Sequence, residues 1–494
     1  MFKLSQILLV ITIAANGLPL ISAPPTPPNI IFIMADDMGS GDVQALNPRS
    51  SIPTPNLNRL ATEGMTFADA HSPSAVCTPT RYGVMTGRYC WRSSLTRGVL
   101  NGYGTPLIEP ERPTVASALR NEGYATGVIG KWHLGLGFQK TNGKWDWDKP
   151  LDYSPIDVGF DYSYVIPASL DFPPYVYIEG HEITGKPDRT QEAISFPTFL
   201  RKGELGSDFS IIDCLDKLTA RASDFIREKT NKEKPFFLYF PLTSPHKPTM
   251  PHPRFQGQSK LGPYADFVIQ TDWTVGQILN TLDEVGATED TIVFYTSDNG
   301  SYMYRYTDSK KPDHVTDNTI QGYYEGNHTA NGVLRGTKAD IWEAGHRVPF
   351  FARWPGKIEA GSRNESTITH TDFYATAVSI AGGTLPKAAD AAQDSFDIPP
   401  LLYGSDERWN RAPVIHHSAG AMFAIRDGEW KLVLGNGSGG RGMPKGKRFE
   451  RPWSLFNLKD DLSETENRLS EYPEIAQRLE QQALEIISTV SSRK

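Results

Sequence analysis

Side chains that could bind a metal ion follow two of the apolar runs in this sequence. Asp36 and Asp37 come just after one run, and Asp298 and Asn299 come just after another. Carboxylate and amide oxygens, without a cluster of cysteine and histidine, are ligands of hard divalent cations. A single aspartate is more often a helix cap or a turn residue, but the repeated arrangement disfavours that interpretation. The pattern predicts a Ca²⁺ site, with Mg²⁺ as the second choice.

A cysteine, a proline and an arginine stand at a distinctive spacing in the segment SAVCTPTRYGVMTGRY. Cys77 lies two residues before Pro79 and four residues before Arg81. A pattern this short can arise by chance, so its significance depends on partners elsewhere in the chain. Groups that bind anions or carry protons do follow other apolar runs, namely Lys131, His133 and His246.

The elements that position these residues are predicted from continuous apolar runs that end in polar residues. The runs are Asn29–Met34, Ala125–Ile129, Pro235–Leu242, Thr291–Thr296 and Val348–Arg353. Such runs fit strands that are buried on both faces, as in a parallel sheet. Helical patterns lie between them at Thr54–Gly64, Thr114–Gly123, Asp213–Thr230 and Tyr264–Gly286. Alternating strands and helices predict a doubly wound α/β sheet, which binds ligands beyond the carboxyl ends of its strands.

The last part of the chain has a different pattern. A stretch rich in Pro, Ala and Asp at Thr384–Pro400 indicates a boundary. Short strands of an antiparallel sheet and a closing helix are then expected at Phe423–Ile425, Trp430–Leu434, Trp453–Asn457 and Glu471–Ser488. We predict a signal peptide over residues 1–23, a catalytic domain over 24–390 and a C-terminal α+β subdomain over 391–494.

The composition is that of an ordinary globular protein, and it limits the possible partners. The 494 residues are 39% hydrophobic and 22% charged, with a formal net charge of −7. No basic run is present, so nucleic acid is not an expected partner. The cysteines Cys77, Cys90 and Cys214 do not form a disulfide framework. Cys90 and Cys214 could pair, but two buried thiols are the favoured interpretation.

The N-terminus is typical of a secretion signal. A positive start at Met1–Lys3 precedes the apolar stretch Ile7–Ala15, and small residues follow up to Ala23. This stretch is of signal-peptide length and is short for a membrane span. We therefore expect a secreted or periplasmic protein without a membrane span in the mature chain. An uncleaved N-terminal anchor is the alternative.

Taken together, the motifs resemble those of formylglycine-dependent sulfatases of the arylsulfatase A-like family, in the alkaline phosphatase superfamily. The segment around Cys77 resembles the signal for oxidation of a cysteine to Cα-formylglycine. The resemblance runs from about Asn29 to the C-terminus and includes Gly123–His133, Ser244–Pro248, Ser297–Gly300 and Gly336–Lys338. It implies a large mixed, mostly parallel sheet sandwiched by helices, with a smaller C-terminal domain of antiparallel sheet plus helix.

The resemblance also implies a mechanism. The aldehyde of the modified Cys77 is hydrated to a gem-diol, and one hydroxyl attacks sulfur to form a covalent sulfo-enzyme. A metal ion polarises that hydroxyl. Its expected ligands are Asp36, Asp37, the modified Cys77, Asp298 and Asn299. The second hydroxyl then loses a proton, and the intermediate releases free sulfate.

The remaining roles follow from the same resemblance. Arg81 holds the formylglycine, and Lys131 and Lys338 bind sulfate oxygens. His133 accepts the proton of the second hydroxyl. His246, with Lys338 as a possible helper, is the general acid for the leaving oxygen. An enzyme that generates formylglycine, or matures sulfatases, is an implied partner.

The substrate is less well defined than the chemistry. An insertion between the Lys131 and His246 runs carries Trp145, Trp147, Phe172, Tyr175 and Tyr177. These aromatic residues could stack on sugar rings, although local packing is the commoner role. Asp171 could accept sugar hydroxyls, and the segment Tyr302–Arg335 is expected to lie over the site. The resemblance suggests sulfated saccharides, with galactose-type sugars sulfated at a primary hydroxyl as the narrower expectation.

Other functions are compatible with parts of the pattern. A phosphonate monoester hydrolase or phosphodiesterase shares the formylglycine and most ligands, and is the closest alternative. A carbohydrate-binding protein without activity would show loss of the site residues, which this sequence keeps. A two-metal zinc phosphatase needs more His and Asp ligands than the motifs supply.

Overall fold

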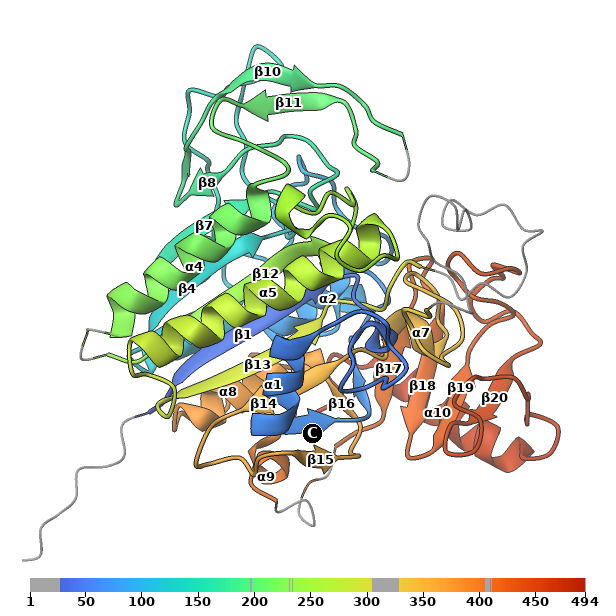
Figure 1. The fold of residues 1–494 in the computed structure, drawn as a ribbon. Coiled ribbons are helices and arrows are strands. Elements are labelled where there is room, and N and C mark those ends of the chain that lie inside the picture. The colour runs from blue at the N-terminus through green and yellow to red at the C-terminus, as the bar shows by residue number, and fades with distance from the viewer. Residues whose placement is uncertain are drawn as a thin grey trace, which may run out of the picture.

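The computed structural model describes residues 27–493, apart from 196–197, 231, 233, 304–327, 405–408 and 410. The expected signal peptide and most of the segment Tyr302–Arg335 therefore lie outside the described residues. A ten-stranded sheet forms the centre of the molecule, in the order β15-β2-β14-β13-β1-β12-β4-β7-β8-β9. Helices cover both of its faces (Figure 1). No helix in the described part of the chain has the length and apolarity needed to cross a membrane.

The central strands are parallel, as the apolar runs predict for four of them; the fifth, at Tyr162–Ile166, was not predicted. They are β13 (Thr291–Ser297), β1 (Asn29–Asp36), β12 (Phe236–Pro245), β4 (Ala125–Lys131) and β7 (Tyr162–Ile166). Their residues are almost all buried, which explains the continuous apolar sequence. Four of these strands end one to three residues after the apolar run that predicted them, so the first polar residues still belong to the strand. They are β1, β12, β4 and β13.

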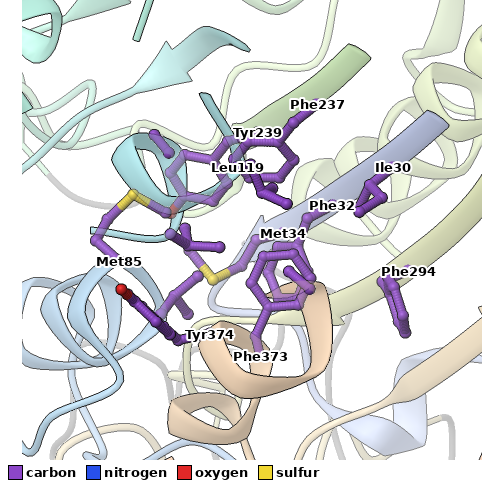
Figure 2. Packing of buried hydrophobic residues seen from close by; sticks show 14 of the residues in the cluster. Ile30, Phe32, Met34, Met85, Leu119, Phe237, Tyr239, Phe294, Phe373 and Tyr374 are labelled. Carbon is purple, nitrogen blue, oxygen red and sulfur yellow. The ribbon is translucent and has the colours of Figure 1, made fainter. Parts of the chain in front are cut away.

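Alternate residues of β1 point to opposite faces of the sheet and enter two separate cores. Ile30, Phe32 and Met34 pack with helices α3 (Val115–Asn121) and α8 (Phe373–Ile380), as Figure 2 shows. The rings of Phe32 and Phe373 are 4.2 Å apart. Each fully buried side chain of this size contributes roughly 1.5–3 kcal/mol by leaving water. Burial on both sides therefore fixes the register of the strand that carries Asp36.

The opposite face is covered by three helices that the sequence predicts to within three residues at each end. They are α1 (Pro55–Glu63), α4 (Cys214–Thr230) and α5 (Pro263–Glu284). Their apolar sides meet Ile31 and Ile33 of β1 in the second core. The helical pattern at Thr114–Gly123 is also confirmed, as α3 on the first face.

The edges of the sheet are mixed in direction. β14 (Phe350–Arg353) runs antiparallel to β13, and β2 (Met65–Phe67) and β15 (Ser362–Asn364) extend that edge. β8 (Ile178–Glu179) and β9 (Glu182–Ile183) form the other edge. The run Val348–Arg353 is thus a strand but not a parallel one, because burial on both faces does not determine direction.

A smaller antiparallel sheet follows near the C-terminus. It contains β17 (Val414–His417), β18 (Phe423–Asp427), β19 (Trp430–Val433) and β20 (Ser454–Asn457). Helix α10 (Pro473–Ser488) packs on it through Leu479, Ala483 and Ile486. β17 was not predicted, because its two histidines hide the strand pattern. The domain boundary near residue 390 stays a prediction.

Several short elements complete the described chain. They include β3 (Ala70–His71), β16 (Ile368–Thr369), β5 (Lys140–Thr141), β6 (Lys144–Trp145), β10 (Pro187–Gln191), β11 (Gly203–Gly206), α7 (Glu343–His346) and α9 (Pro399–Leu402). Helix α2 (Cys77–Thr86) was not predicted, and every one of its residues is buried.

Candidate active site

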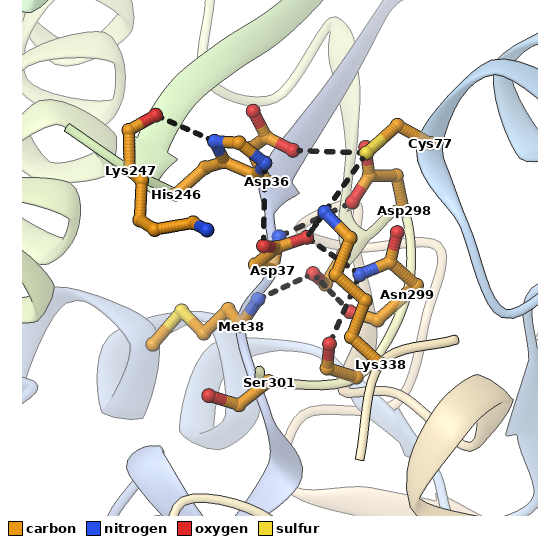
Figure 3. A network of polar contacts seen from close by, with 12 residues as sticks. Asp36, Asp37, Met38, Cys77, His246, Lys247, Asp298, Asn299, Ser301 and Lys338 are labelled. Atoms are coloured by element: carbon orange, nitrogen blue, oxygen red, sulfur yellow. Dashed lines mark hydrogen bonds and ion pairs between the residues drawn. The ribbon is translucent and has the colours of Figure 1, made fainter. Parts of the chain in front are cut away.

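The predicted site residues meet at the carboxyl edge of the parallel strands. Asp36 is the last residue of β1, and Lys131 is the last residue of β4. His246 directly follows β12, and Asp298 directly follows β13. Parallel neighbours end on the same edge of a sheet, so the polar residues that end these runs come together. Figure 3 shows most of this group in one place.

Cys77 is the first residue of α2, and the helix brings it to this edge. Its Sγ lies 3.7 Å from Asp36 Oδ1 and 3.2 Å from Lys338 Nζ. The positive end of a helix dipole and its free backbone N–H groups favour an anion at this point. Burial, and then the charge of Asp298, raise the pKa of the Cys77 thiol to about 12. At neutral pH the encoded thiol is therefore protonated and is a weak nucleophile.

We call Asp36, Asp37, Cys77, Lys131 and Lys338 the active-site cluster. Its carboxylates are paired with cations, and Asp298 beside it is paired in the same way. Lys131 Nζ lies 2.7 Å from Asp36, Lys338 Nζ lies 2.5 Å from Asp37, and Arg81 Nη2 lies 2.6 Å from Asp298. Such pairs offset the large cost of burying single charges. The site is close to electrically neutral before any ligand binds.

Arg81 has a second anchor within the site. Its Nη1 donates to the backbone carbonyl of Lys131 at 2.9 Å, and the side chain is fully buried. Burial alone would lower the pKa of Arg81, but the charge of Asp298 raises it above its usual value. Arg81 is thus a fixed positive charge one helical turn from Cys77.

Two oxygen atoms of the site are left free for a metal ion. Asp37 Oδ2 and Asn299 Oδ1 are buried and accept no hydrogen bond from the described residues. Asn299 Nδ2 donates to Asp37 Oδ1 at 2.7 Å, which turns the amide oxygen away from that contact. Asp36, Asp37, Cys77 and His246 each offer a ligand atom within 4.8 Å of the others. Unused oxygens in this setting fit a hard divalent cation.

The backbone is strained at two positions of the site. Asp37 has φ 67° and His133 has φ 58°, in the left-handed region that glycine favours. Such conformations cost of order 1–3 kcal/mol and persist only where the surroundings hold them. At Asp37 the backbone N–H donates to Asp298 Oδ1 at 3.2 Å, which helps to keep the two carboxylates side by side.

His246 is placed to exchange a proton at one nitrogen. Its Nδ1 lies 2.6 Å from the backbone carbonyl of Lys247, so Nδ1 carries the hydrogen. Its Nε2 then faces Asp37 Oδ2 at 3.5 Å. Burial, and then the charge of Lys338, lower the pKa of His246 to about 3. The free enzyme therefore holds a neutral imidazole at pH 7.

His133 is also neutral. Its Nε2 donates to the carbonyl of Leu100 at 2.8 Å, which leaves Nδ1 without a partner among the described residues. Burial first, and then the charges of Lys131 and Arg81, lower the pKa of His133 well below its usual value. A neutral imidazole with a free Nδ1 is suited to accept a proton.

Two cations to which the sequence analysis did not assign a role lie near the site, Arg201 in the insertion and Lys247 next to His246. Arg201 forms an ion pair with Asp171 and lies over the ring of Phe172, 3.9 Å from its centre. Asp171 Oδ1 lies 3.8 Å from His246 Nδ1, and it accepts no hydrogen bond from the described residues. Lys247 is the second cation, and burial, followed by Arg441, lowers its pKa to about 8. Nothing in the local sequence of Arg201 predicts this position.

Most of the aromatic residues of the insertion pack locally. Tyr175 and Tyr177 are 1% and 0% exposed and belong to the core. Trp145 is stacked on Tyr103, with ring centres 5.0 Å apart, and Lys140 lies 4.1 Å from the centre of its ring. Phe172 lies beside the site instead, 6.2 Å from the ring of His133.

The three cysteines are free and buried, so the favoured interpretation of two buried thiols at Cys90 and Cys214 agrees with the structure.

Comparisons with known proteins agree with this geometry. Residues 28–383 match the family described as Sulfatase. The chain is 33% identical to an N-acetylgalactosamine-6-O-sulfatase of Bacteroides thetaiotaomicron, over 94% of this chain and 93% of the relative. It is 31% identical to human steryl-sulfatase, over 81% of this chain and 73% of the relative.

A solved structure extends the likeness to three dimensions. A B. thetaiotaomicron protein, described with the metabolism of multiple glycosaminoglycans, superposes with a TM-score of 0.81 at 31% identity. The match covers 94% of this chain and 100% of that protein. The mixed, mostly parallel sheet with its small C-terminal antiparallel sheet is therefore the sulfatase fold. This chain belongs to the sulfatase family of sulfuric ester hydrolases, in the alkaline phosphatase-like superfamily.

Proposed function

We propose that this protein is a secreted or periplasmic sulfatase that removes sulfate from sulfated saccharides, with formylglycine made from Cys77 as its nucleophile. The observation that carries the proposal is the position of Cys77. The residue starts a buried helix, 3.2 Å from Lys338 Nζ, at the edge where the oxygen ligands gather. Conversion of Cys77 to a hydrated aldehyde would give the site one hydroxyl for attack on sulfur and a second whose deprotonation releases sulfate.

The metal in this proposal is Ca²⁺, with Mg²⁺ as the weaker candidate. Asp36, Asp37, Asp298, Asn299 and the modified Cys77 would hold it. The free oxygens of Asp37 and Asn299 support this assignment. When bound, the ion would supply positive charge that lowers the pKa of the attacking hydroxyl and offsets charge on the sulfate.

The cations of the chain would hold the sulfate ester in place. Lys131 and Lys338 contact the carboxylates on either side of Cys77, so their ammonium groups flank the reacting position. Arg81 would orient the modified residue from inside the helix. Fixed positive charges of this kind stabilise the charge that develops on sulfate oxygens in the transition state.

Proton transfer would use the two histidines at different stages. His246 would give a proton to the leaving oxygen, and it must first gain one, because burial keeps its imidazole neutral in the free enzyme. An anionic substrate next to Nε2 favours that protonation. His133 would accept the proton of the second hydroxyl at Nδ1, so that the covalent sulfo-enzyme breaks down to aldehyde and sulfate.

The saccharide would be recognised by groups from the insertion. Asp171 offers a free carboxylate oxygen to a sugar hydroxyl, and Arg201 forms an ion pair with its other oxygen. The relative named as an N-acetylgalactosamine-6-O-sulfatase supports a galactose-type sugar sulfated at its primary hydroxyl.

The test is sulfate release from a panel of sulfated mono-, oligo- and polysaccharides, with a phosphonate monoester in parallel. The protein is produced together with a formylglycine-generating or sulfatase-maturating enzyme, and conversion of Cys77 is checked by mass spectrometry. We expect release from a 6-sulfated galactose-type sugar. Turnover of the phosphonate alone would move the protein to the alternative, a phosphonate monoester hydrolase. Inactivity on the whole panel with Cys77 converted would favour a binding protein.

A further inference from the structure

Three buried histidines form a second polar group away from the catalytic residues. We call His71, His346 and His416 the histidine cluster. They come from β3, α7 and β17, and each is 0% exposed. One ring nitrogen of each lies within 4.8 Å of the others. Because β17 belongs to the small four-stranded sheet, the cluster joins that sheet to β3 and α7, which lie outside it.

The outer nitrogens of two of these rings have acceptors. His71 Nε2 lies 2.9 Å from Asp69 Oδ1, and His346 Nε2 lies 3.1 Å from the backbone carbonyl of Ile341. A carboxylate or a backbone carbonyl on the far nitrogen is what metal-binding histidines have as a rule.

With hydrogens on both Nε2 atoms, the lone pairs of both Nδ1 atoms face each other. His71 Nδ1 and His346 Nδ1 are 3.0 Å apart. Two lone pairs at this distance repel unless a positive species lies beside them. Ring nitrogens bound to one tetrahedral zinc ion are roughly 3.3 Å apart, given bonds of about 2.0–2.1 Å. The observed separation is close to that value.

His416 supplies an independent sign of a missing partner. Both of its ring nitrogens are buried, and neither has a hydrogen-bond partner among the described residues. Its ring lies on that of His346, with centres 3.8 Å apart and planes 10° apart. A buried polar group without a partner costs roughly 1–3 kcal/mol.

We propose that the histidine cluster binds a transition-metal ion, Zn²⁺, which fastens the small sheet to the segments that carry His71 and His346. His71 and His346 bind through Nδ1, and His416 binds after its ring turns about the Cβ–Cγ bond out of the stack. Three imidazoles form a set that suits zinc and does not suit calcium.

One metal-free arrangement competes with this proposal. Lys431 Nζ lies 3.2 Å from His346 Nε2. If Lys431 donates a hydrogen bond to His346 Nε2, then His346 carries its hydrogen on Nδ1 and donates it to His71 Nδ1. The two rings then need no metal ion between them. His416 stays without a partner in that arrangement.

The experiment is a zinc assay of the full chain, made without a histidine tag and dialysed against zinc and then against buffer with calcium. Elemental analysis should find about one zinc ion per chain. X-ray absorption should show imidazole ligands, and anomalous scattering from crystals should place the ion between His71, His346 and His416. Less than about a tenth of an equivalent, or a zinc peak only beside Asp36 and Asp37, would overturn the proposal.

Variants add a second measurement. His416→Gln should lower bound zinc at least about tenfold, and His252→Gln, at a partly exposed histidine outside both clusters, should leave it unchanged. A zinc-selective chelator should lower the Tm of the wild type and not that of His416→Gln. If His416→Gln does not fold, anomalous scattering from wild-type crystals still decides whether zinc is bound between the three histidines. Unchanged zinc in a folded His416→Gln protein would contradict the assignment.

Discussion

The active-site cluster and the histidine cluster are both buried, and each has a lysine between acidic groups. Lys338 contacts Asp37 and Cys77, and Lys431 contacts Glu343 and Glu464. Lys338 is 7% exposed and Lys431 is 0% exposed. His246, across from Lys338, is 6% exposed. The first lysine is thus slightly exposed to solvent, whereas the second is fully buried against Glu343, Glu464 and His346.

The two proposals account for this difference: the active-site cluster would exchange ligands, and the histidine cluster would hold the fold together. The active-site cluster keeps paired charges around Cys77. The histidine cluster has fully buried rings, and its segments come from parts of the chain that meet only in the folded protein. We therefore expect changes in the first cluster to affect turnover and changes in the second to affect stability.

The largest effect is expected for Cys77→Ala. The change removes the precursor of the nucleophile, so sulfate release should fall at least ~10⁴-fold. The Tm should stay close to that of the wild type, because little packing is lost. Cys214→Ala, at another buried thiol, should keep its activity. Sulfate release by Cys77→Ala at the wild-type rate would rule out the mechanism.

The two lysines provide the sharpest contrast. Lys338→Met should lower kcat/KM by about 10²–10³-fold, since a charge that stabilises the transition state is lost. Lys431→Met should lower the free energy of unfolding by about 3–5 kcal/mol, because Glu343 and Glu464 lose their buried partner. Steady-state kinetics and chemical denaturation measure the two effects. The same pattern of losses in both variants would remove the distinction between the clusters.

A smaller effect is expected at the substrate side of the active site. Asp171→Asn should raise KM for the sulfated sugar roughly tenfold, because a hydrogen bond from a sugar hydroxyl to a charged oxygen is weakened. Turnover of a small aryl sulfate should change little. Asp188→Asn, at an exposed carboxylate in the same insertion, is the control. An equal loss of activity on both substrates would indicate that Asp171 acts through His246 and not by binding the sugar.

The last prediction concerns His370, whose pKa is influenced by Asp298 beside the active-site cluster and by His71 of the histidine cluster. Burial lowers its pKa to about 3, although the charge of Asp298 opposes that shift. The unfolded chain takes up a proton below about pH 6.5, while the folded protein does not until about pH 3. This imidazole therefore reduces stability by about 1.4 kcal/mol per pH unit as the pH falls through that window.

His370→Gln removes this contribution. Its free energy of unfolding should fall less steeply than that of the wild type between pH 6.5 and pH 4, as measured by denaturant titration at several pH values. Identical slopes would show that His370 is protonated in the folded protein.

The sequence predicted the elements that carry the chemistry because their patterns are local. The runs that become β1, β4, β12 and β13 are apolar on both faces, and their polar ends mark one edge of the sheet. It missed α2, whose apolar residues do not form a stripe because all sides of the helix are buried. It missed β17 for a similar reason, since the buried histidines of that strand look polar.

The sequence by itself determined the parallel core, the spacing around Cys77 and the candidate oxygen ligands, and these motifs already resembled the sulfatase family. Only the tertiary structure decided the charge pairs, the free oxygens of Asp37 and Asn299, and the place of Arg201. It alone brought together His71, His346 and His416, which are far apart in the sequence. The physical reason is that periodicity records burial along one element, whereas a contact between distant segments depends on how all the layers pack.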